Sequence, residues 1–277
     1  MSAAALHAAA ERAGVEFTAV RPAEPAPRRD ARTESQAFQL ALAALDRLSA
    51  YHSYRAEGLD RALGVTGPLL VACNHSLATY DAVLLALAGY RASGRWFHAM
   101  ADRLFFRIPG VAQAFETLGF VEGTRARATE LLARGEVLGI LPGGMRESLR
   151  SSRERYTFDW RGRLGFVRLS LSTGAPIVLA ACPRADDIFH VADSRLTRAA
   201  YRALRLPLPL FRGRGPTPIP RPVPLCHLLS EPIAPPVAPD QVVERDVVAH
   251  HEHLCRRMER LMRDALELPL HPSGVRP

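Results

Sequence analysis

The sequence predicts an α/β fold, a layered domain with a mostly parallel sheet flanked by helices. Short, continuous apolar runs, which are typical of strands buried on both faces, alternate along the chain with segments of helical spacing. Glycine or proline follows most of these segments and marks where each one ends. The 277 residues, 48% of them hydrophobic, are enough for one large domain or two small ones.

The chain begins with residues 1–35, which are rich in Ala, Arg, Glu and Pro and are expected to form a flexible lead-in. Within this segment, residues 1–14 are compatible with a short helix. Residues 36–54 are expected to form an N-terminal amphipathic helix, whose apolar stripe packs on the core or faces a membrane. The stripe consists of Phe38, Ala41, Leu42, Leu45, Leu48 and Tyr51.

Five apolar runs are the expected strands of the sheet: residues 68–73, 96–101, 118–121, 137–141 and 176–182. Helical spacing predicts helices between them at 81–90, 124–134 and 164–173. Seven prolines within 207–224 exclude a regular helix or a central strand and predict an extended surface loop. An edge strand is expected near 225–228, and a C-terminal helix follows at 239–268.

The charge balance is strongly basic. The 36 Lys+Arg residues are all arginine, against 28 acidic residues, which leaves a net charge of +8. The absence of lysine excludes Schiff-base and P-loop chemistry. The charge alone is compatible with nucleic acid, anionic lipid or a phosphorylated substrate. Because the arginines are dispersed among acidic residues and aromatics make up only 7%, we expect no nucleic-acid partner.

Cysteines and histidines give no strong metal signal. The four cysteines form no Cys-x-x-Cys pair, so neither a zinc module nor a disulfide framework is indicated, and Cys73 and Cys182 read as small core residues of a protein in a reducing cytoplasm. The histidines near Cys255 lack metal-site spacing, and the adjacent Asp186 and Asp187 are expected to be solvated. No secretory signal and no membrane-spanning run is visible in the sequence.

The most informative segment is Asn-His-Ser-Leu-Ala-Thr-Tyr-Asp at residues 74–81. His75 stands just beyond the first buried strand, where an α/β sheet presents its site, and Asp81 lies where the next helix should begin. A loop of this length can fold back so that the carboxylate meets one imidazole nitrogen and leaves the other free as a base. Alternatively, His75 ends a strand and Asp81 caps a helix.

Two further segments carry groups suited to anions. In Leu-Pro-Gly-Gly-Met-Arg-Glu at residues 141–147, the amides of Gly143 and Gly144 can cradle an oxyanion and Arg146 offers a positive fork. In residues 119–125, Arg125 stands near a helix N-terminus. The alternatives are a tight turn and ordinary surface arginines.

The joint order of these segments, followed by Gly-Ala-Pro-Ile-Val at residues 174–178, resembles the glycerolipid acyltransferase superfamily. The similarity covers about residues 50–235 and is closest to the branch of mono- and diacylglycerol acyltransferases. Most of the superfamily has His-x4-Asp, and the spacing here is one residue longer. Enzymes with phosphate-bearing acceptors carry Pro-Glu-Gly-Thr-Arg, so that Gly143 replaces their acidic residue.

The resemblance implies a single acyltransferase domain over residues 36–277, with a catalytic core at 55–235. It makes His75 the general base and Asp81 the residue that orients it, with no enzyme nucleophile; Ser76 is read as loop structure, and a Gly-x-Ser-x-Gly elbow is absent from the sequence. The substrate-binding residues it implies are Gly143, Gly144, Arg146, Glu147 and Arg125.

The implied partners are an acyl thioester donor, acyl-CoA or acyl-carrier protein, and a lipid alcohol such as a partial glyceride. We expect no metal, no resident cofactor and a peripheral position on an anionic membrane surface, at the inner face of the cell membrane. A lysophospholipid or amine acceptor, or a non-catalytic lipid-binding protein with the same fold, remain alternatives. The oligomeric state is left open.

Overall fold

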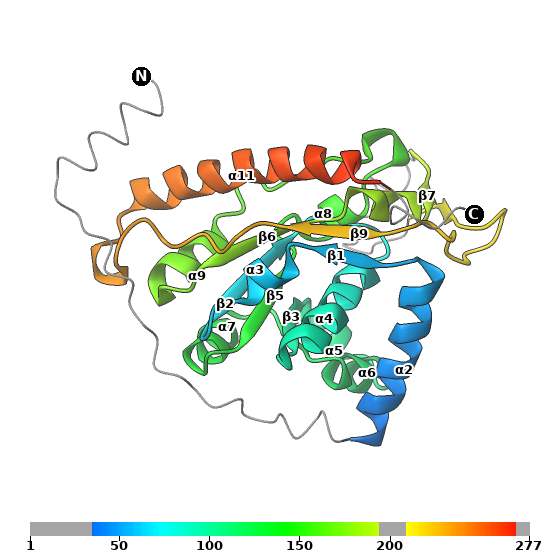
Figure 1. Ribbon diagram of the computed structural model, residues 1–277, viewed down its shortest axis with the longest axis horizontal. Coiled ribbons are helices and arrows are strands. Elements are labelled where there is room, and N and C mark those ends of the chain that lie inside the picture. Colours follow the sequence, from blue (N-terminus) through cyan, green and yellow to red (C-terminus); the bar gives the residue numbers. More distant parts are fainter. Residues whose placement is uncertain (1–34, 194–208, 270–277) are drawn as a thin grey trace.

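The computed structural model describes residues 35–193 and 209–269, so all but the last residue of the predicted lead-in at 1–35, with its short helix, lies outside the described residues. The centre of the fold is a seven-stranded sheet with the order β1-β9-β6-β2-β5-β3-β4 (Figure 1). Its strands are β1 Arg55–Glu57, β2 Leu69–Cys73, β3 Phe97–Ala101, β4 Phe120–Glu122, β5 Val137–Ile140, β6 Ile177–Ala181 and β9 Cys226–Leu229. All neighbouring strands are parallel except β6 and β9, which confirms the predicted α/β fold.

The core lies on both faces of this sheet because side chains of a strand point alternately to opposite faces. In β2, Leu69 and Val71 belong to the apolar cluster on one face, whereas Leu70 and Ala72 belong to the cluster on the other. Every residue of β2 and β6 is buried. The continuous apolar runs of the sequence therefore mark strands covered on both sides, as predicted.

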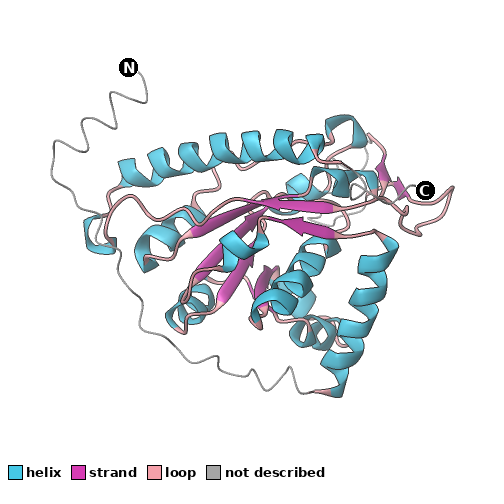
Figure 2. Ribbon diagram, in the orientation of Figure 1, coloured by secondary structure: helices cyan, strands magenta, loops and turns pink. Residues whose placement is uncertain are grey.

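Helices cover both faces of the sheet (Figure 2). One face is covered by α2 Gln36–Tyr51, α3 Leu59–Leu63 and α4 Tyr80–Ser93. The other is covered by α7 Arg125–Ala133, α9 Gly165–Thr173 and α11 Glu244–Glu267. Two short helices, α5 Arg103–Phe106 and α6 Val111–Thr117, lie near the β4 edge, and α8 Gly144–Ser148 directly follows β5.

The apolar stripe of α2 packs into the core. Ser35 caps this helix by accepting a hydrogen bond from the Phe38 amide at 3.1 Å. Phe38 is buried and meets Tyr90 and Trp96 edge-on, with ring centroids 6.0 and 5.0 Å apart. Leu42 and Leu45 are also buried, whereas Tyr51 is exposed, so most of this stripe packs on the core, as the first alternative predicted.

The strand near the C-terminal end of the sheet differs from the prediction. We expected an edge strand at 225–228, but β9 lies inside the sheet because β1 pairs with its outer side. With three residues and polar ends, β1 carries no recognisable strand pattern. The proline-rich segment is largely extended, and within its described part β8 Phe211–Arg212 pairs with β7 His190–Val191.

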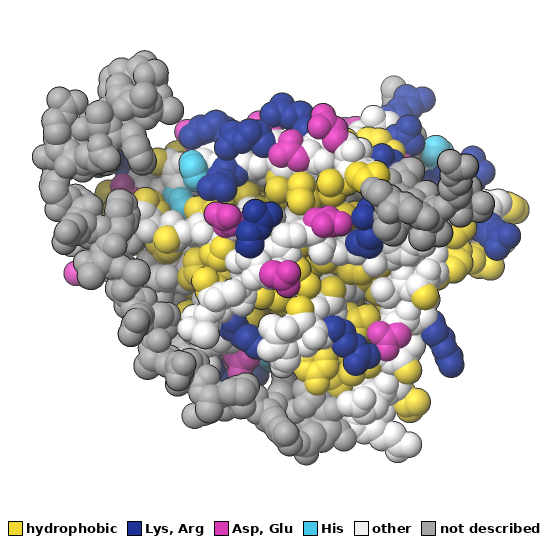
Figure 3. All heavy atoms as spheres, in the orientation of Figure 1, with side chains coloured by type: hydrophobic (Ala, Val, Ile, Leu, Met, Phe, Trp, Pro, Cys, Tyr) yellow, Lys and Arg dark blue, Asp and Glu magenta, His cyan; other side chains and the backbone are white. Residues whose placement is uncertain are grey.

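The described surface is charged and mixed. Figure 3 shows arginine side chains dispersed over one face with acidic side chains between them. Among the helices of residues 35–193 and 209–269, none combines the length and apolar character needed to cross a membrane.

Candidate active site

The candidate site lies where β2, β5 and β6 end. These three strands are adjacent and parallel, so the segments that follow them meet at one edge of the sheet. Asn74 fastens two of these ends together: its side-chain amide donates to the Cys182 carbonyl at 3.3 Å, and its oxygen accepts from the Cys182 amide at 2.8 Å. His75 follows directly and is held at this edge.

The His75 imidazole is oriented by the backbone of its own loop. Its Nδ1 lies 2.9 Å from the Ser76 carbonyl oxygen, an acceptor, so Nδ1 carries the proton and Nε2 is the unprotonated nitrogen. Burial lowers the pKa of His75 to about 4, and the positive charge of Arg150 acts in the same direction. The ring is therefore neutral at pH 7, in the tautomer that a general base at Nε2 requires.

Asp81 does not meet this imidazole, in contrast to the expected contact. Its Oδ1 accepts a hydrogen bond from the Ser76 hydroxyl at 2.8 Å, and the Ser76 oxygen accepts from the Thr79 amide at 3.2 Å. The five intervening residues form a turn closed on Ser76, with Thr79 in the left-handed region at φ 60°. Thr79 precedes α4, so Asp81 lies in its first turn and holds the loop that carries His75.

Glu147 is a residue of the loop framework whose side chain is completely buried. Its Oε1 accepts from the His75 amide at 2.6 Å, and its Oε2 accepts from the Asp159 amide at 3.2 Å. A substrate cannot reach a carboxylate in this position, so the expected direct contact between Glu147 and substrate is not supported. Burial raises the pKa of Glu147 to about 7.

Gly143 and Gly144 have different surroundings, and only at Gly143 would a side chain clash. A Cβ at Gly143 would lie 1.6 Å from Oε2 of Glu147, so a glycine is needed for the Glu147 carboxylate to fold against this backbone. Gly144 has φ 57° and open space around it. Its amide already donates to the Leu141 carbonyl at 3.0 Å, which leaves it unsuited to hold an oxyanion.

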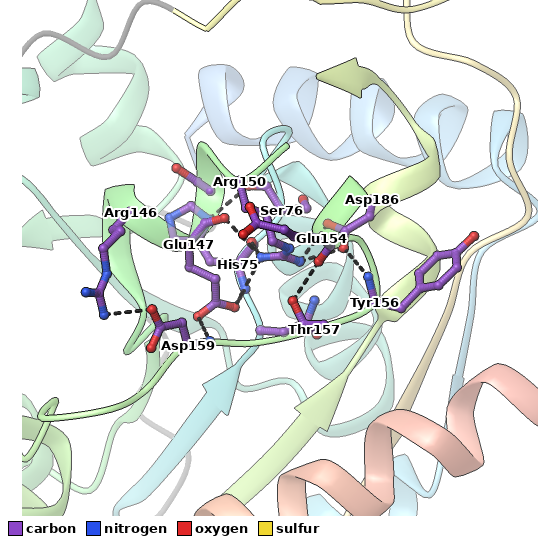
Figure 4. A network of polar contacts seen from close by, with 12 residues as sticks. His75, Ser76, Arg146, Glu147, Arg150, Glu154, Tyr156, Thr157, Asp159 and Asp186 are labelled. Atoms are coloured by element: carbon purple, nitrogen blue, oxygen red, sulfur yellow. Dashed lines mark hydrogen bonds and ion pairs between the residues drawn. The ribbon is translucent and has the colours of Figure 1, made fainter. Parts of the chain in front are cut away.

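Arg150 is the hub of the network and was not singled out from the sequence (Figure 4). Its Nη1 donates to the carbonyls of His75 at 2.8 Å and Glu147 at 3.0 Å. Its Nη2 contacts both carboxylate oxygens of Asp186, at 2.7 and 2.6 Å. One buried guanidinium thus ties together the segments after β2, β5 and β6.

The expectation that Asp186 and Asp187 are solvated is wrong. The side chain of Asp186 is only 8% exposed and also accepts from the Tyr156 amide at 2.8 Å. Asp187 accepts from the Tyr156 hydroxyl at 2.7 and 2.8 Å. The pair lies in the short 3-10 helix η3 Pro183–Asp187, where the two carboxylates accept hydrogen bonds from Arg150 and Tyr156. The sequence could not predict that Arg150 is the partner of Asp186, because several other arginines lie near it in the chain.

The two candidate anion-binding arginines lie in different environments. Arg146 is half-exposed and its Nη2 lies 2.7 Å from Oδ2 of Asp159, so its positive charge is partly matched (Figure 4). Arg125 is exposed in the first turn of α7, beyond the edge strand β4. In the described residues no hydrogen bond or ion pair joins Arg125 to the His75 loop. His75, Gly143, Gly144, Arg146 and Glu147 are brought together; Arg125 is not joined to them.

An apolar cavity adjoins the His75 loop. Thr79, whose hydroxyl lies 3.5 Å from Nδ1 of His75, is part of its wall. The remaining wall comes from α4, from strands β2 to β5 and from residues next to these strands, including Val71, Ala86, Phe97, Phe120 and Leu141. The cavity is apolar and about 30 Å³ in volume.

Side chains of the types that bind metal ions gather at two places in the described residues. On α11, His251 uses Nε2 to hydrogen-bond the Trp160 carbonyl at 2.9 Å, and the Cys255 sulfur lies 3.7 Å from the same nitrogen. The side chains of Asp81, Cys182 and His227 form a second group in the described part of the chain, with ligand atoms all within 4.8 Å of one another.

The site thus combines a mostly parallel sheet, a buried, neutral histidine at its carboxyl edge and an adjoining apolar cavity. Residues 52–182, just under half of the chain, match the family model described as Acyltransferase. The family resemblance in the sequence is thereby confirmed.

Curated relatives extend the comparison. A Bos taurus protein described as a "DGAT1/2-independent enzyme synthesizing storage lipids" is 27% identical over 198 residues, which are 70% of this chain and 57% of that protein. The Homo sapiens protein of the same description is also 27% identical over 198 residues, 70% of this chain and 59% of that protein. An uncharacterized Mycobacterium leprae protein is 30% identical over 156 residues, 54% of this chain and 42% of that protein. The chain thus spans somewhat more than half the length of its first two relatives.

A solved structure shares the fold. The crystal structure of the 1-acyl-sn-glycerophosphate (LPA) acyltransferase PlsC from Thermotoga maritima superposes with a TM-score of 0.52 at 17% sequence identity. The similarity covers 84% of this chain and 81% of that protein. At this identity the comparison establishes the fold and carries no information on the substrate.

Proposed function

We propose that this protein moves a fatty acyl group from an acyl thioester to the hydroxyl of a lipid acceptor, with Nε2 of His75 as the general base. The observation that carries the proposal is the neutral, tautomer-fixed imidazole of His75 beside an apolar cavity. The acyltransferase family and the names of the storage-lipid relatives support the same chemistry.

In the proposed reaction, Nε2 of His75 removes the proton of the acceptor hydroxyl as its oxygen attacks the thioester carbonyl carbon. The tetrahedral intermediate then expels the thiolate, which takes the proton back from His75, so that the protein is unchanged after one turnover. Because the Gly144 amide is occupied, we assign the oxyanion contact to the Gly143 amide. Asp81 acts as a positioning residue through Ser76.

The acceptor we favour is an uncharged lipid alcohol, such as a partial glyceride. Gly143 stands where enzymes with phosphate-bearing acceptors have an acidic residue, and a substrate cannot reach the buried Glu147 carboxylate beside it. Arg146 is engaged with Asp159, which reduces its attraction for a second anion. A lysophospholipid acceptor is the second candidate, because Arg146 remains half-exposed.

The test is a transfer assay with purified protein. Labelled acyl-CoA or acyl-carrier protein is offered with diacylglycerol, monoacylglycerol, lysophosphatidate or a long-chain amine, and the products are separated by chromatography. We expect transfer to a glyceride, and a loss of about 10²–10⁴-fold in kcat for His75→Ala. His190→Ala, which alters an exposed histidine on β7, is the matched control and should retain activity.

Each outcome of this assay bears on the proposal. Undiminished transfer by His75→Ala would reject the assignment of the base. Preference for lysophosphatidate over glycerides would replace the acceptor, and preference for the amine would replace the reaction class. If the folded protein binds lipids but transfers nothing to any acceptor, the non-catalytic alternative is the better one.

We also infer that the described part of the proline-rich segment contacts an anionic membrane surface. Leu210, Phe211 and Ile219 are exposed large apolar residues, and Arg212 and Arg214 are exposed beside them. Apolar tips flanked by arginine suit the boundary between lipid headgroups and acyl chains. The double variant Phe211→Asp with Ile219→Asp should cosediment less with phosphatidylglycerol vesicles, whereas Val248→Asp on α11 should not change binding. Equal binding by all three proteins would refute this surface.

A further inference from the structure

Beneath the His75 loop, three side chains from distant parts of the sequence converge. Asp81 comes from the first turn of α4, Cys182 directly follows β6, and His227 lies in β9. One ligand atom from each lies within 4.8 Å of the others, and all three residues are buried. A carboxylate, a thiol and an imidazole in one place are the side chains that bind zinc in proteins.

Two atoms at the centre of this group make no hydrogen bond. Oδ2 of Asp81 and Nε2 of His227 are both buried without a hydrogen-bond partner among the described residues, and they lie 3.9 Å apart. A buried carboxylate without a partner is costly. The guanidinium of Arg150 makes its own contacts with Glu147 and Asp186, so within the described part of the chain Asp81 has no directly paired cation.

The outer atoms of the same two side chains are held by neighbours. Nδ1 of His227 lies 3.0 Å from the Tyr54 hydroxyl, and Oδ1 of Asp81 accepts from the Ser76 hydroxyl at 2.8 Å. This is the arrangement around a metal ligand, in which the non-coordinating atom is fixed by a hydrogen bond and the coordinating atom is aimed inward.

We propose that Asp81, Cys182 and His227 bind one divalent transition-metal ion of the zinc class, through Oδ2, Sγ and Nε2. A thiolate and a carboxylate neutralise the two positive charges of the ion, which makes the buried site neutral. Thiolate and imidazole favour zinc over magnesium or calcium. Ligand atoms around zinc lie about 3.5 Å apart, so atoms within 4.8 Å of one another need only small inward shifts.

The role of this ion is structural. Because all three ligands are buried, substrate does not reach it, and it joins α4, β6 and β9 under the turn that Asp81 holds through Ser76. The competing explanation of the same geometry is metal-free: Asp81 keeps a proton and donates it to His227 in a hydrogen bond. The two explanations differ in metal content, which can be measured without any acyltransferase assay.

The experiment uses full-length, tag-free protein, freed of metal and titrated with Co²⁺ under reducing conditions. A bound cobalt ion with a cysteine ligand gives thiolate-to-metal absorption in the near ultraviolet. Cys255→Ser is the background for all measurements, because it removes the half-buried cysteine beside His251. In this background we expect about one cobalt ion per chain, and a higher melting temperature when zinc is added.

Adding Cys182→Ser or His227→Gln should abolish both the absorption and the zinc-dependent stabilisation, whereas adding His75→Ala should leave both intact and abolish acyl transfer. Absence of the absorption band in the folded Cys255→Ser protein would overturn the proposal, and so would retention of the metal by both ligand variants. If the ligand variants do not fold, the presence or absence of the band in Cys255→Ser alone decides. Failure of the proposed acyl transfer would leave these readouts unaffected.

Discussion

Two buried polar regions support the His75 loop, and they differ in how their charges are matched. In the first, the guanidinium of Arg150 meets Asp186 at 2.6 Å and lies 3.6 Å from Glu147, so that two carboxylates share one cation. In the second, Asp81 faces His227 at 3.9 Å, and no arginine of residues 35–193 and 209–269 forms an ion pair with it. The comparison shows that the effect of burying a carboxylate depends on its partners. Carboxylates paired with a buried arginine hold backbone segments together, whereas a buried carboxylate without a paired cation must bind a proton or a metal ion.

The largest expected effect is that of removing the cation from the matched region. Arg150→Ala leaves Glu147 and Asp186 buried without their partner, which should reduce the free energy of unfolding by about 3–5 kcal/mol. Urea denaturation measures this change. Arg153→Ala, at a side chain 84% exposed, is the control and should cost less than about 1 kcal/mol. Equal effects of the two substitutions would show that the Arg150 network does not support the fold.

The unmatched region should respond to pH. Burial raises the pKa of Asp81 to about 6, above its ordinary value of 3.8, so the folded protein binds this proton more tightly than the unfolded chain does. The Asp81 carboxyl alone should therefore lower the stability of the metal-free protein by about 2–3 kcal/mol as the pH rises from about 4 to about 6, against the opposite contribution of buried His75, whose lowered pKa adds stability over the same range. Denaturation at several pH values measures this slope.

Asp81→Asn should remove this downward contribution, so that its stability rises more steeply between about pH 4 and about pH 6 than that of the wild type, and Asp60→Asn, at an exposed position, should leave the pH dependence unchanged. Zinc should stabilise the protein more strongly as the pH rises, because it binds the deprotonated carboxylate and thiolate. An unchanged slope in Asp81→Asn would show that the carboxyl of Asp81 is not the group responsible.

A smaller effect is expected from crowding the matched region. Gly143→Ala places a Cβ 1.6 Å from the Glu147 carboxylate, which must move away from the His75 amide. We expect a loss of about 1–3 kcal/mol in unfolding free energy together with reduced acyl transfer. Gly165→Ala, where a Cβ meets nothing within 4 Å, is the control for calorimetry and should be neutral or slightly stabilising. A tolerated Gly143→Ala would mean that Glu147 does not fix the loop.

The smallest expected effect on stability is that of breaking the partly exposed ion pair between Arg146 in α8 and Asp159. Arg146 and Asp159 are 2.7 Å apart, but Arg146 is half-exposed, so Arg146→Gln should change the free energy of unfolding by less than about 1 kcal/mol. Raising the salt concentration should shrink even this difference. A loss comparable to that of Arg150→Ala would erase the distinction between buried and exposed pairs on which the comparison rests.

Local patterns predicted much of the fold. The five expected strands correspond to β2 to β6, because strands buried on both faces are continuous apolar runs, and α2 followed from its 3.6-residue period. His75 could be placed at the edge of the sheet because it directly follows such a run. β1 was missed because three residues with polar ends show no periodicity.

Contacts between distant residues could not be predicted in the same way. Arg150 is one of many arginines, and its partner Asp186 is separated from it by several elements. Nothing in the sequence brings Asp81, Cys182 and His227 together, since their proximity depends on the order of strands in the sheet. The direct contact expected between Asp81 and His75 failed because the hydroxyl of Ser76 satisfies the carboxylate first.

The position of β9 has a consequence for how the chain folds during synthesis. β9 lies between β6 and β1, yet it is made long after both of them. Until Cys226–Leu229 emerges from the ribosome, β1 lacks its neighbour in the described sheet, and the backbone of β6 presents an open edge. Since His227 arrives on the same strand, closure of the sheet and completion of the buried Asp81 group are a single late event, and slow folding is expected of such non-local pairing.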